Sequence, residues 1–199
     1  LPPLEFPGAP PTRTRQVGVV VQDQVKIADR WSVVAGVRRD YAKSSNAASP
    51  ETATDAAAWY SRAGVVYLGW AGLAPYASYS QSFDPVSGTD AAGAVFKPKR
   101  GEQIEAGLKW EPASVPVQAS GAYYTIEERN RLVTDPVNFG KNIQLGEAKI
   151  KGVELEARGE VKSWALLGSY TWSQARASAG TSGGDLDPAQ QLEGIPEHQ

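Results

Sequence analysis

Residues 102–110 read Glu-Gln-Ile-Glu-Ala-Gly-Leu-Lys-Trp, and this stretch decides the fold class. Every second residue in it is apolar, from Ile104 through Ala106 and Leu108 to Trp110, and the residues between them are polar or glycine. Successive side chains of a β-strand point to opposite faces, whereas a helix repeats every 3.6 residues. The stretch therefore predicts a strand with one apolar and one polar face.

The same alternation recurs on both sides of this stretch. From Arg15 to Ile27 the odd positions are mostly valine, and from Trp31 to Val37 the apolar residues again lie two apart. Weaker alternation predicts five more strands at about 59–69, 73–83, 115–126, 146–160 and 164–174. The sequence therefore predicts an all-β chain of about eight strands, most of about the 9–11 residues that cross a bilayer at a tilt.

The predicted connections are alternately short and long. The short ones lie at 28–30, 69–72, 111–114 and 161–163. The long ones lie at 42–58, 84–101, 127–145 and from 175 onward. This alternation predicts an antiparallel up-and-down meander with all short turns at one end, as in outer-membrane barrels. A soluble β-sandwich would instead have connections of mixed length at both ends.

Aromatic residues gather near both ends of the predicted strands. Those beside short connections are Trp31, Trp70, Trp110 and Trp164, and those toward the long ones are Trp59, Trp172, Tyr41, Tyr79 and Tyr170. Two such bands are typical of the girdles at membrane interfaces. We therefore expect one face to point to lipid, with Val17, Val19, Val21, Ile104, Ala106, Leu108 and Trp110.

Composition excludes several classes of site. The chain has no Cys, which excludes disulfides and thiolate metal sites, and its single His, His198, leaves little scope for a histidine-based metal site. Twenty Lys and Arg stand against 22 Asp and Glu, which is not the basic balance typical of nucleic-acid binding. The sequence contains no run of about 18 apolar residues, so it predicts no membrane-spanning helix.

Three passages resemble the C-terminal part of the barrel of TonB-dependent siderophore receptors. They are residues 16–40, with Gln22-Asp23-Gln24 and Gly36-Val37-Arg38-Arg39-Asp40, residues 76–109, and residues 146–172, with Gly152-Val153-Glu154-Leu155-Glu156. Ile195-Pro196-Glu197-His198 also resembles the segment before the family's next strand. Order and spacing match the family across nearly all of residues 14–199.

The resemblance implies an arc of a bacterial outer-membrane barrel of about 22 strands with a folded plug in its lumen. The plug, the segment that contacts the TonB complex and the terminal strand are expected outside residues 1–199. The implied function is TonB-dependent import of ferric siderophores without covalent chemistry. Iron would be carried only as the ferric siderophore, with no resident cofactor.

Polar residues of the predicted strands are expected to face the lumen and the plug. They are Arg38, Asp40, Arg62, Glu105, Lys109, Glu154, Glu156 and Arg158. Charge is tolerated in such a lumen because water or partner groups are at hand. Glu154 and Glu156 would share one face about 6–7 Å apart, a spacing compatible with a catalytic carboxylate pair. The family shows the same motif without enzymatic activity.

Ligand contact is expected on the long loops, because function collects on loops held by a rigid scaffold. The candidates are Tyr60, Phe83, Phe96, Lys97, Arg129, Arg131, Asn138 and Phe139. The loop at 127–145 combines basic residues with Phe139, a mixture suited to an anionic chelate with flat catechol or hydroxamate groups. The basic run Lys97-Pro98-Lys99-Arg100 could meet lipopolysaccharide phosphates at the outer leaflet.

Two alternative functions remain open at this stage. A passive outer-membrane porin would share the barrel pattern but lack an upstream plug. A soluble β-sandwich binding module, such as an adhesin, would share the strands but fold without detergent.

Overall fold

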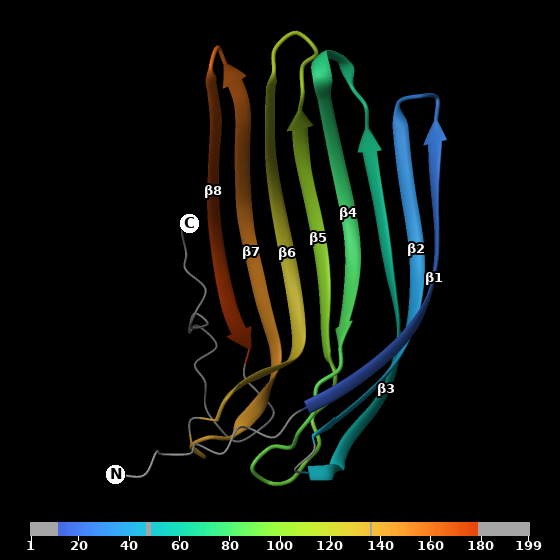
Figure 1. Ribbon diagram of the computed structural model, residues 1–199, viewed down its shortest axis with the longest axis vertical. Coiled ribbons are helices and arrows are strands. Elements are labelled where there is room, and N and C mark those ends of the chain that lie inside the picture. Colours follow the sequence, from blue (N-terminus) through green and yellow to red (C-terminus); the bar gives the residue numbers. More distant parts are fainter. Residues whose placement is uncertain (1–11, 47–48, 136, 179–199) are drawn as a thin grey trace.

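A computed structural model of the chain describes residues 12–46, 49–135 and 137–178. In these residues eight antiparallel strands form one curved sheet in chain order (Figure 1). The strands are β1 Thr12–Ile27, β2 Trp31–Asn46, β3 Ser49–Tyr67, β4 Leu73–Asp84, β5 Lys99–Trp110, β6 Val117–Thr134, β7 Asn142–Val161 and β8 Trp164–Ser178. One 3-10 turn, η1, covers Trp70–Gly72. The predicted all-β meander is confirmed.

All four short connections lie at one end of the sheet, drawn at the top of Figure 1 and called the short-turn end below. Between β1 and β2, Ala28 and Asp29 have φ values of 50° and 53°, and the Arg30 N–H donates to the Ile27 carbonyl at 3.2 Å. Two central residues with positive φ make a type I′ turn, whose twist matches that of paired strands. The predicted placement of the short turns is therefore confirmed.

The strands continue much further toward the opposite, long-loop end than the sequence predicts. β7 has 20 residues and even the shortest strands, β4 and β5, have 12. The predicted loop at 42–58 is almost wholly strand, the one at 127–145 shrinks to 135–141, and the one at 84–101 to 85–98. The predicted strand lengths were wrong because the extension of β2 and β3 is polar or small on both faces, and that of β6 and β7 has only a few apolar residues, such as Leu132, Val133 and Ile143. Backbone pairing persists there without apolar alternation.

Strand register sorts the side chains onto two faces. Directly opposed residues share a face, as in Val21↔Val37 and Val33↔Val65. One face, the apolar face, carries the seven predicted apolar residues, including Val19 at 70% and Ile104 at 60% exposure. In the described residues only Ala42, Ala58, Phe96, Ala148 and Ala175 are buried hydrophobic residues. The sheet therefore has no interior core, and its apolar face is left open.

Aromatic residues mark two levels on the apolar face. Trp31, Trp110 and Trp164 lie near the short turns, and Tyr41 follows Trp31 on the same face of β2. From residue 31 to residue 41 the strand rises about 33 Å, which a tilt of about 45° reduces to about 23 Å. That separation is near the height of the apolar band of a membrane barrel. Among the residues that the structure describes, no helix is long and apolar enough to cross a membrane.

Candidate functional site

The other face, the polar face, holds all eight residues predicted to face a lumen. Register places Arg38, Asp40, Arg62, Glu105, Lys109, Glu154, Glu156 and Arg158 on it. They divide among local clusters instead of forming one site. Glu156, Arg158 and Lys109 line a hollow of about 270 Å³ near the short-turn end. In the described part of the chain, no group of acidic or histidine residues could hold a metal ion.

The tightest of these clusters surrounds Asp40, whose side chain is fully buried. Its carboxylate accepts hydrogen bonds from Arg38 Nε at 2.7 Å, Gln16 Nε2 at 2.5 Å and the Tyr60 hydroxyl at 2.5 Å. The residue opposite Asp40 on β1 is Gly18, and a Cβ there would lie 1.8 Å from Asp40 Oδ1. A glycine at this position therefore makes the room in which the carboxylate is held.

Asp40 also orients Tyr60, one of the predicted ligand residues. The Tyr60 ring stacks on Phe83, another predicted ligand residue, with centroids 6.5 Å apart and ring planes at 22°. Backbone pairing of β3 with β4 runs only from Val66↔Tyr76 to Arg62↔Ser80, so the strands diverge beyond it. The structure thus brings two predicted residues together across a seam in the sheet.

A second cluster lies midway along the polar face. The Tyr76 hydroxyl donates to Glu105 Oε1 at 2.6 Å, and Lys109 Nζ lies 5.4 Å from the centre of the Tyr76 ring. Gly107, opposite Tyr76, leaves space for the ring, because a Cβ there would lie 2.7 Å from it. The ring therefore lies flat against the wall. Glu154 faces Tyr76 and Tyr124, whereas Glu156 lines the hollow described above, so the two carboxylates have different surroundings.

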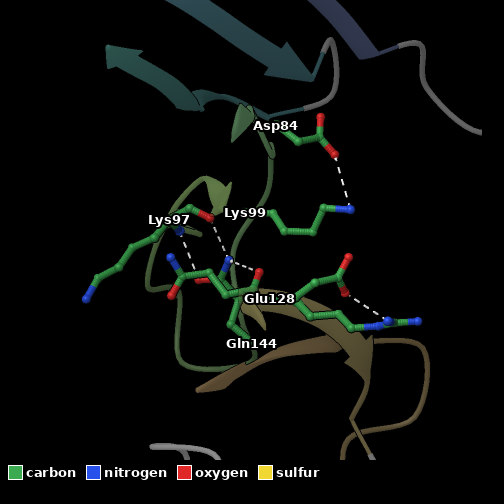
Figure 2. A network of polar contacts seen from close by, with 7 residues as sticks. Asp84, Lys97, Lys99, Glu128 and Gln144 are labelled. Carbon is green, nitrogen blue, oxygen red and sulfur yellow. Dashed lines mark hydrogen bonds and ion pairs between the residues drawn. The ribbon is translucent and has the colours of Figure 1, made fainter. Parts of the chain in front are cut away.

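At the long-loop end the polar face has an open hollow of about 280 Å³, called the ion-pair hollow. Figure 2 shows the polar contacts of its charged residues. Its lining residues are Asp84, Val86, Lys99, Glu128, Arg131 and Leu132. Lys99 Nζ lies 3.7 Å from Asp84 Oδ2, and Arg131 Nη1 lies 2.9 Å from Glu128 Oε2. All four charged side chains keep some exposure, between 20% and 62%. The hollow therefore offers donors and acceptors to a ligand.

Gln144 on β7 joins the segments beside this hollow, as Figure 2 shows. Its Nε2 donates to the carbonyls of Lys97 at 2.6 Å and Asn130 at 3.1 Å, and its Oε1 accepts from the Lys97 N–H at 2.9 Å. Asn130 Nδ2 donates to the Pro98 carbonyl at 2.8 Å. This latch holds the end of the 85–98 loop against β6 and β7. Sequence reasoning missed both residues, because an isolated amide in a strand carries no pattern.

The remaining predicted ligand residues have different placements. Phe96 is buried against Gly88 within its own loop, so its ring does not face a ligand here. Arg129 lies on the apolar side, opposite Arg100 and Glu147. Neither Phe96 nor Arg129 lies beside the ion-pair hollow on the polar face. The side chain of Lys97 is exposed.

Asp135 and residues 137–141 form a structured turn between β6 and β7. Asp135 Oδ1 accepts from the N–H groups of Val137 at 2.8 Å and Asn138 at 3.0 Å, and Asn138 Nδ2 donates to Asp135 Oδ2 at 2.8 Å. These bonds, the Asn138 side chain foremost, lower the pKa of Asp135 below its usual value. Asn138 thus shapes the turn, and Phe139 is fully exposed at its tip.

Comparisons with known proteins agree on one family. The family model described as "TonB dependent receptor-like, beta-barrel" matches residues 3–199. The chain is 35% identical over 192 residues to the ferrichrome outer membrane transporter/phage receptor of Escherichia coli K12, covering 94% of this chain and 25% of that protein. It is 37% identical over 172 residues to the ferrioxamine B receptor of Salmonella typhimurium, covering 82% and 24%.

Solved structures show the same fold. The sheet superposes on the ferripyoverdine receptor of Pseudomonas aeruginosa with a TM-score of 0.76 at 23% identity, covering 94% of this chain and 25% of that one. The chain thus spans about a quarter of the length of these relatives.

Proposed function

Because the chain belongs to the TonB-dependent receptor family, as part of an integral outer-membrane β-barrel, we propose that the complete protein imports ferric siderophores across the outer membrane. The observation that carries the proposal is a two-faced wall, with an open apolar band on one face and a charged hollow on the other. The protein binds the chelate outside and releases it inward, with no bond made or broken. The TonB complex supplies the energy through a plug region.

The two faces then have distinct environments. The apolar face, with Val17, Val19, Val21, Ile104, Ala106, Leu108 and Trp110, points to lipid. The eight polar residues that share the opposite face are directed to the lumen side, and those that keep exposure contact the plug. Glu156 and Arg158 support this, because they border a hollow that a plug side chain can enter. Asp40 is instead buried in the wall, where it holds Arg38 and Tyr60.

The ligand site lies at the long-loop end of the polar face, on the outer side of the membrane. It comprises Tyr60, the ion-pair hollow with Arg131, and the exposed Lys97, Asn138 and Phe139. Phe83 lies opposite Arg100 and belongs by register to the apolar side, and its ring reaches Tyr60 through the seam between β3 and β4. Aromatic and charged side chains suit the oxygen-rich surface of a ferric chelate. The relatives named for ferrichrome and ferrioxamine B support a siderophore as the substrate.

Lipopolysaccharide is the lipid partner that we propose for the apolar side beyond the outer aromatic level. Arg15 lies directly opposite Lys43 there, and Arg100 directly opposite Arg129. Like charges in direct opposition destabilise a sheet. Lys43 is paired with Asp55 at 3.6 Å and Arg129 lies opposite Glu147, so phosphate groups of the outer leaflet would offer counter-charges chiefly to Arg15 and Arg100. Of the basic run at 97–100, Arg100 lies on this side, whereas Lys99 lines the ion-pair hollow.

Iron-limited growth of a strain that lacks the receptor gene tests the proposed function. Complementation with the complete gene should restore uptake of labelled ferric siderophore, and loss of TonB should abolish that uptake. Uptake that continues at the same rate without TonB would instead indicate a passive porin. No uptake of any ferric chelate by a well-expressed receptor would refute the siderophore proposal.

A further inference from the structure

The charged residues of the ion-pair hollow neutralise one another. Lys99 is paired with Asp84 and Arg131 with Glu128, so two cations face two carboxylates in one cavity. The bordering segments have the same balance. Residues 84–99 contain two Asp and two Lys, and residues 127–141 contain three acidic and three basic residues. This part of the wall therefore presents no excess positive charge to a ligand.

Ferric chelates differ sharply in charge. A ferric ion held by three singly charged hydroxamates is neutral, whereas three doubly charged catecholates leave a trianion. The binding free energy of a trianion is most favourable where unpaired cations can form ion pairs with it. Without such cations, nothing offsets the cost of removing its water. In the ion-pair hollow Asp84 and Glu128 are already the anionic partners of Lys99 and Arg131, and these carboxylates would repel the trianion. The hollow is therefore unfavourable for a strongly anionic chelate.

An uncharged, oxygen-rich chelate fits the same groups. Arg131 carries five N–H donors and Lys99 three, so each keeps donors beyond its ion pair for hydroxamate oxygens. The two carboxylates can accept from amide N–H groups of the chelate's backbone. Val86 and Leu132 in the lining offer contact to its alkyl spacers. The Gln144 latch holds the adjoining loop in place, which lowers the entropy lost on binding.

We infer that this wall selects an uncharged ferric chelate of the tris(hydroxamate) class over a trianionic tris(catecholate). The inference rests on the proposed siderophore function and names the substrate class of that same site. It replaces the anionic ligand suggested by the loop composition alone, because Arg131 is paired and Arg129 lies on the other side of the sheet.

Equilibrium binding to the purified complete receptor in detergent tests the inference. The probes are the ferric complex of N-acetylated desferrioxamine, which is uncharged, and a ferric tris(catecholate). The wild-type receptor should bind the hydroxamate complex at least about tenfold more tightly, a difference of about 1.4 kcal/mol. The double variant Asp84→Asn, Glu128→Gln frees both cations and should shrink or reverse this ratio. Glu102→Gln, an acid-to-amide change on β5 outside the hollow, should leave it unchanged.

The outcomes separate this inference from the proposed function. Binding of neither chelate by folded receptor would overturn the inference, whereas the proposed function fails only if no ferric chelate is taken up. Tighter binding of the catecholate would overturn the inference alone. A hydroxamate preference that the double variant leaves intact would also overturn it, because the selectivity would then arise elsewhere in the receptor. Heat-modifiable mobility on gels confirms that each variant has a folded barrel.

Discussion

At the scale of single residues, glycines on the polar face make room for larger neighbours. The absence of a side chain at Gly18 leaves space for the Asp40 carboxylate, and the absence of one at Gly107 leaves space for the Tyr76 ring. Gly152 lies beneath Tyr124 in the same way. A large side chain that lies flat over a glycine can hydrogen-bond to neighbouring residues of the sheet. It also takes up little space on the polar side of the sheet. Such pairs also pin strand register.

Replacement of Gly18 by alanine should destabilise the barrel. The new Cβ would displace the buried Asp40 carboxylate from its three donors, and an unsatisfied buried polar group costs about 1–3 kcal/mol, more when it is charged. Urea unfolding of the complete receptor in lipid vesicles measures the loss. Gly168→Ala is the matched control, since none of the residues that the structure describes lies within 4 Å of a Cβ there. Equal stability of both variants would contradict the packing described for Gly18.

The amide of Gln144 should control the 85–98 loop. In Gln144→Ala the three hydrogen bonds to Lys97 and Asn130 disappear, so amide hydrogen exchange in the loop should rise. Siderophore affinity should fall several-fold as the loop loses its fixed position. Gln24→Ala, which removes a single exposed bond to Ser32, serves as the control. Unchanged exchange in Gln144→Ala would show that the latch does not restrain the loop.

The turn at 135–141 should loosen in acid. Its hydrogen bonds need the Asp135 carboxylate, whose pKa is lowered in the fold, mainly by the Asn138 side chain. The bonds therefore stabilise the turn fully above the unfolded pKa of about 3.9 and are lost as pH falls through the lowered value. Hydrogen exchange of residues 137–140, corrected for intrinsic rates, should show this transition. Asp135→Asn should abolish it, and a transition that persists in that variant would assign it to another group.

At the scale of elements, the turn between β6 and β7 is the projecting part of the longest hairpin. Replacement of residues 135–141 by a short Gly-Ser turn should weaken siderophore uptake and leave the barrel assembled. The strands keep their pairing, and loop closure entropy changes slowly with length. Iron-limited growth measures the effect, with surface expression as the control. Normal uptake by a well-expressed variant would leave the 85–98 loop and the ion-pair hollow as the contact sites.

At the scale of the whole molecule, the open apolar face requires lipid. Ile104 is 60% exposed on that face, about midway along β5. An arginine near the middle of the bilayer on the lipid side of a barrel costs about 2–4 kcal/mol. Ile104→Arg should therefore destabilise the folded receptor in lipid vesicles by that amount. Gln103→Arg, one residue earlier and on the polar face, should change stability little. Equal losses in both variants would contradict the assignment of the apolar face to lipid.

The sequence by itself determined the strand order, the position of every short turn and the division into two faces. Each of these follows from local rules: alternation of period two, turn residues, and the change of face at each residue along a strand. It also identified all eight polar-face residues, because side-chain direction follows directly from strand parity. Its last predicted passage, at 195–198, lies outside the described residues.

Only the tertiary structure decided the strand lengths and the composition of the site. The extensions beyond the apolar band are held by backbone pairing to neighbouring strands, which leaves no apolar pattern to detect. The pairing of Arg131 with Glu128 and of Lys99 with Asp84, and the latch of Gln144, depend on twist and loop paths that bring separate segments together. The chain thus encodes which face is polar, whereas three-dimensional neighbours decide which of its charges remain available to a ligand.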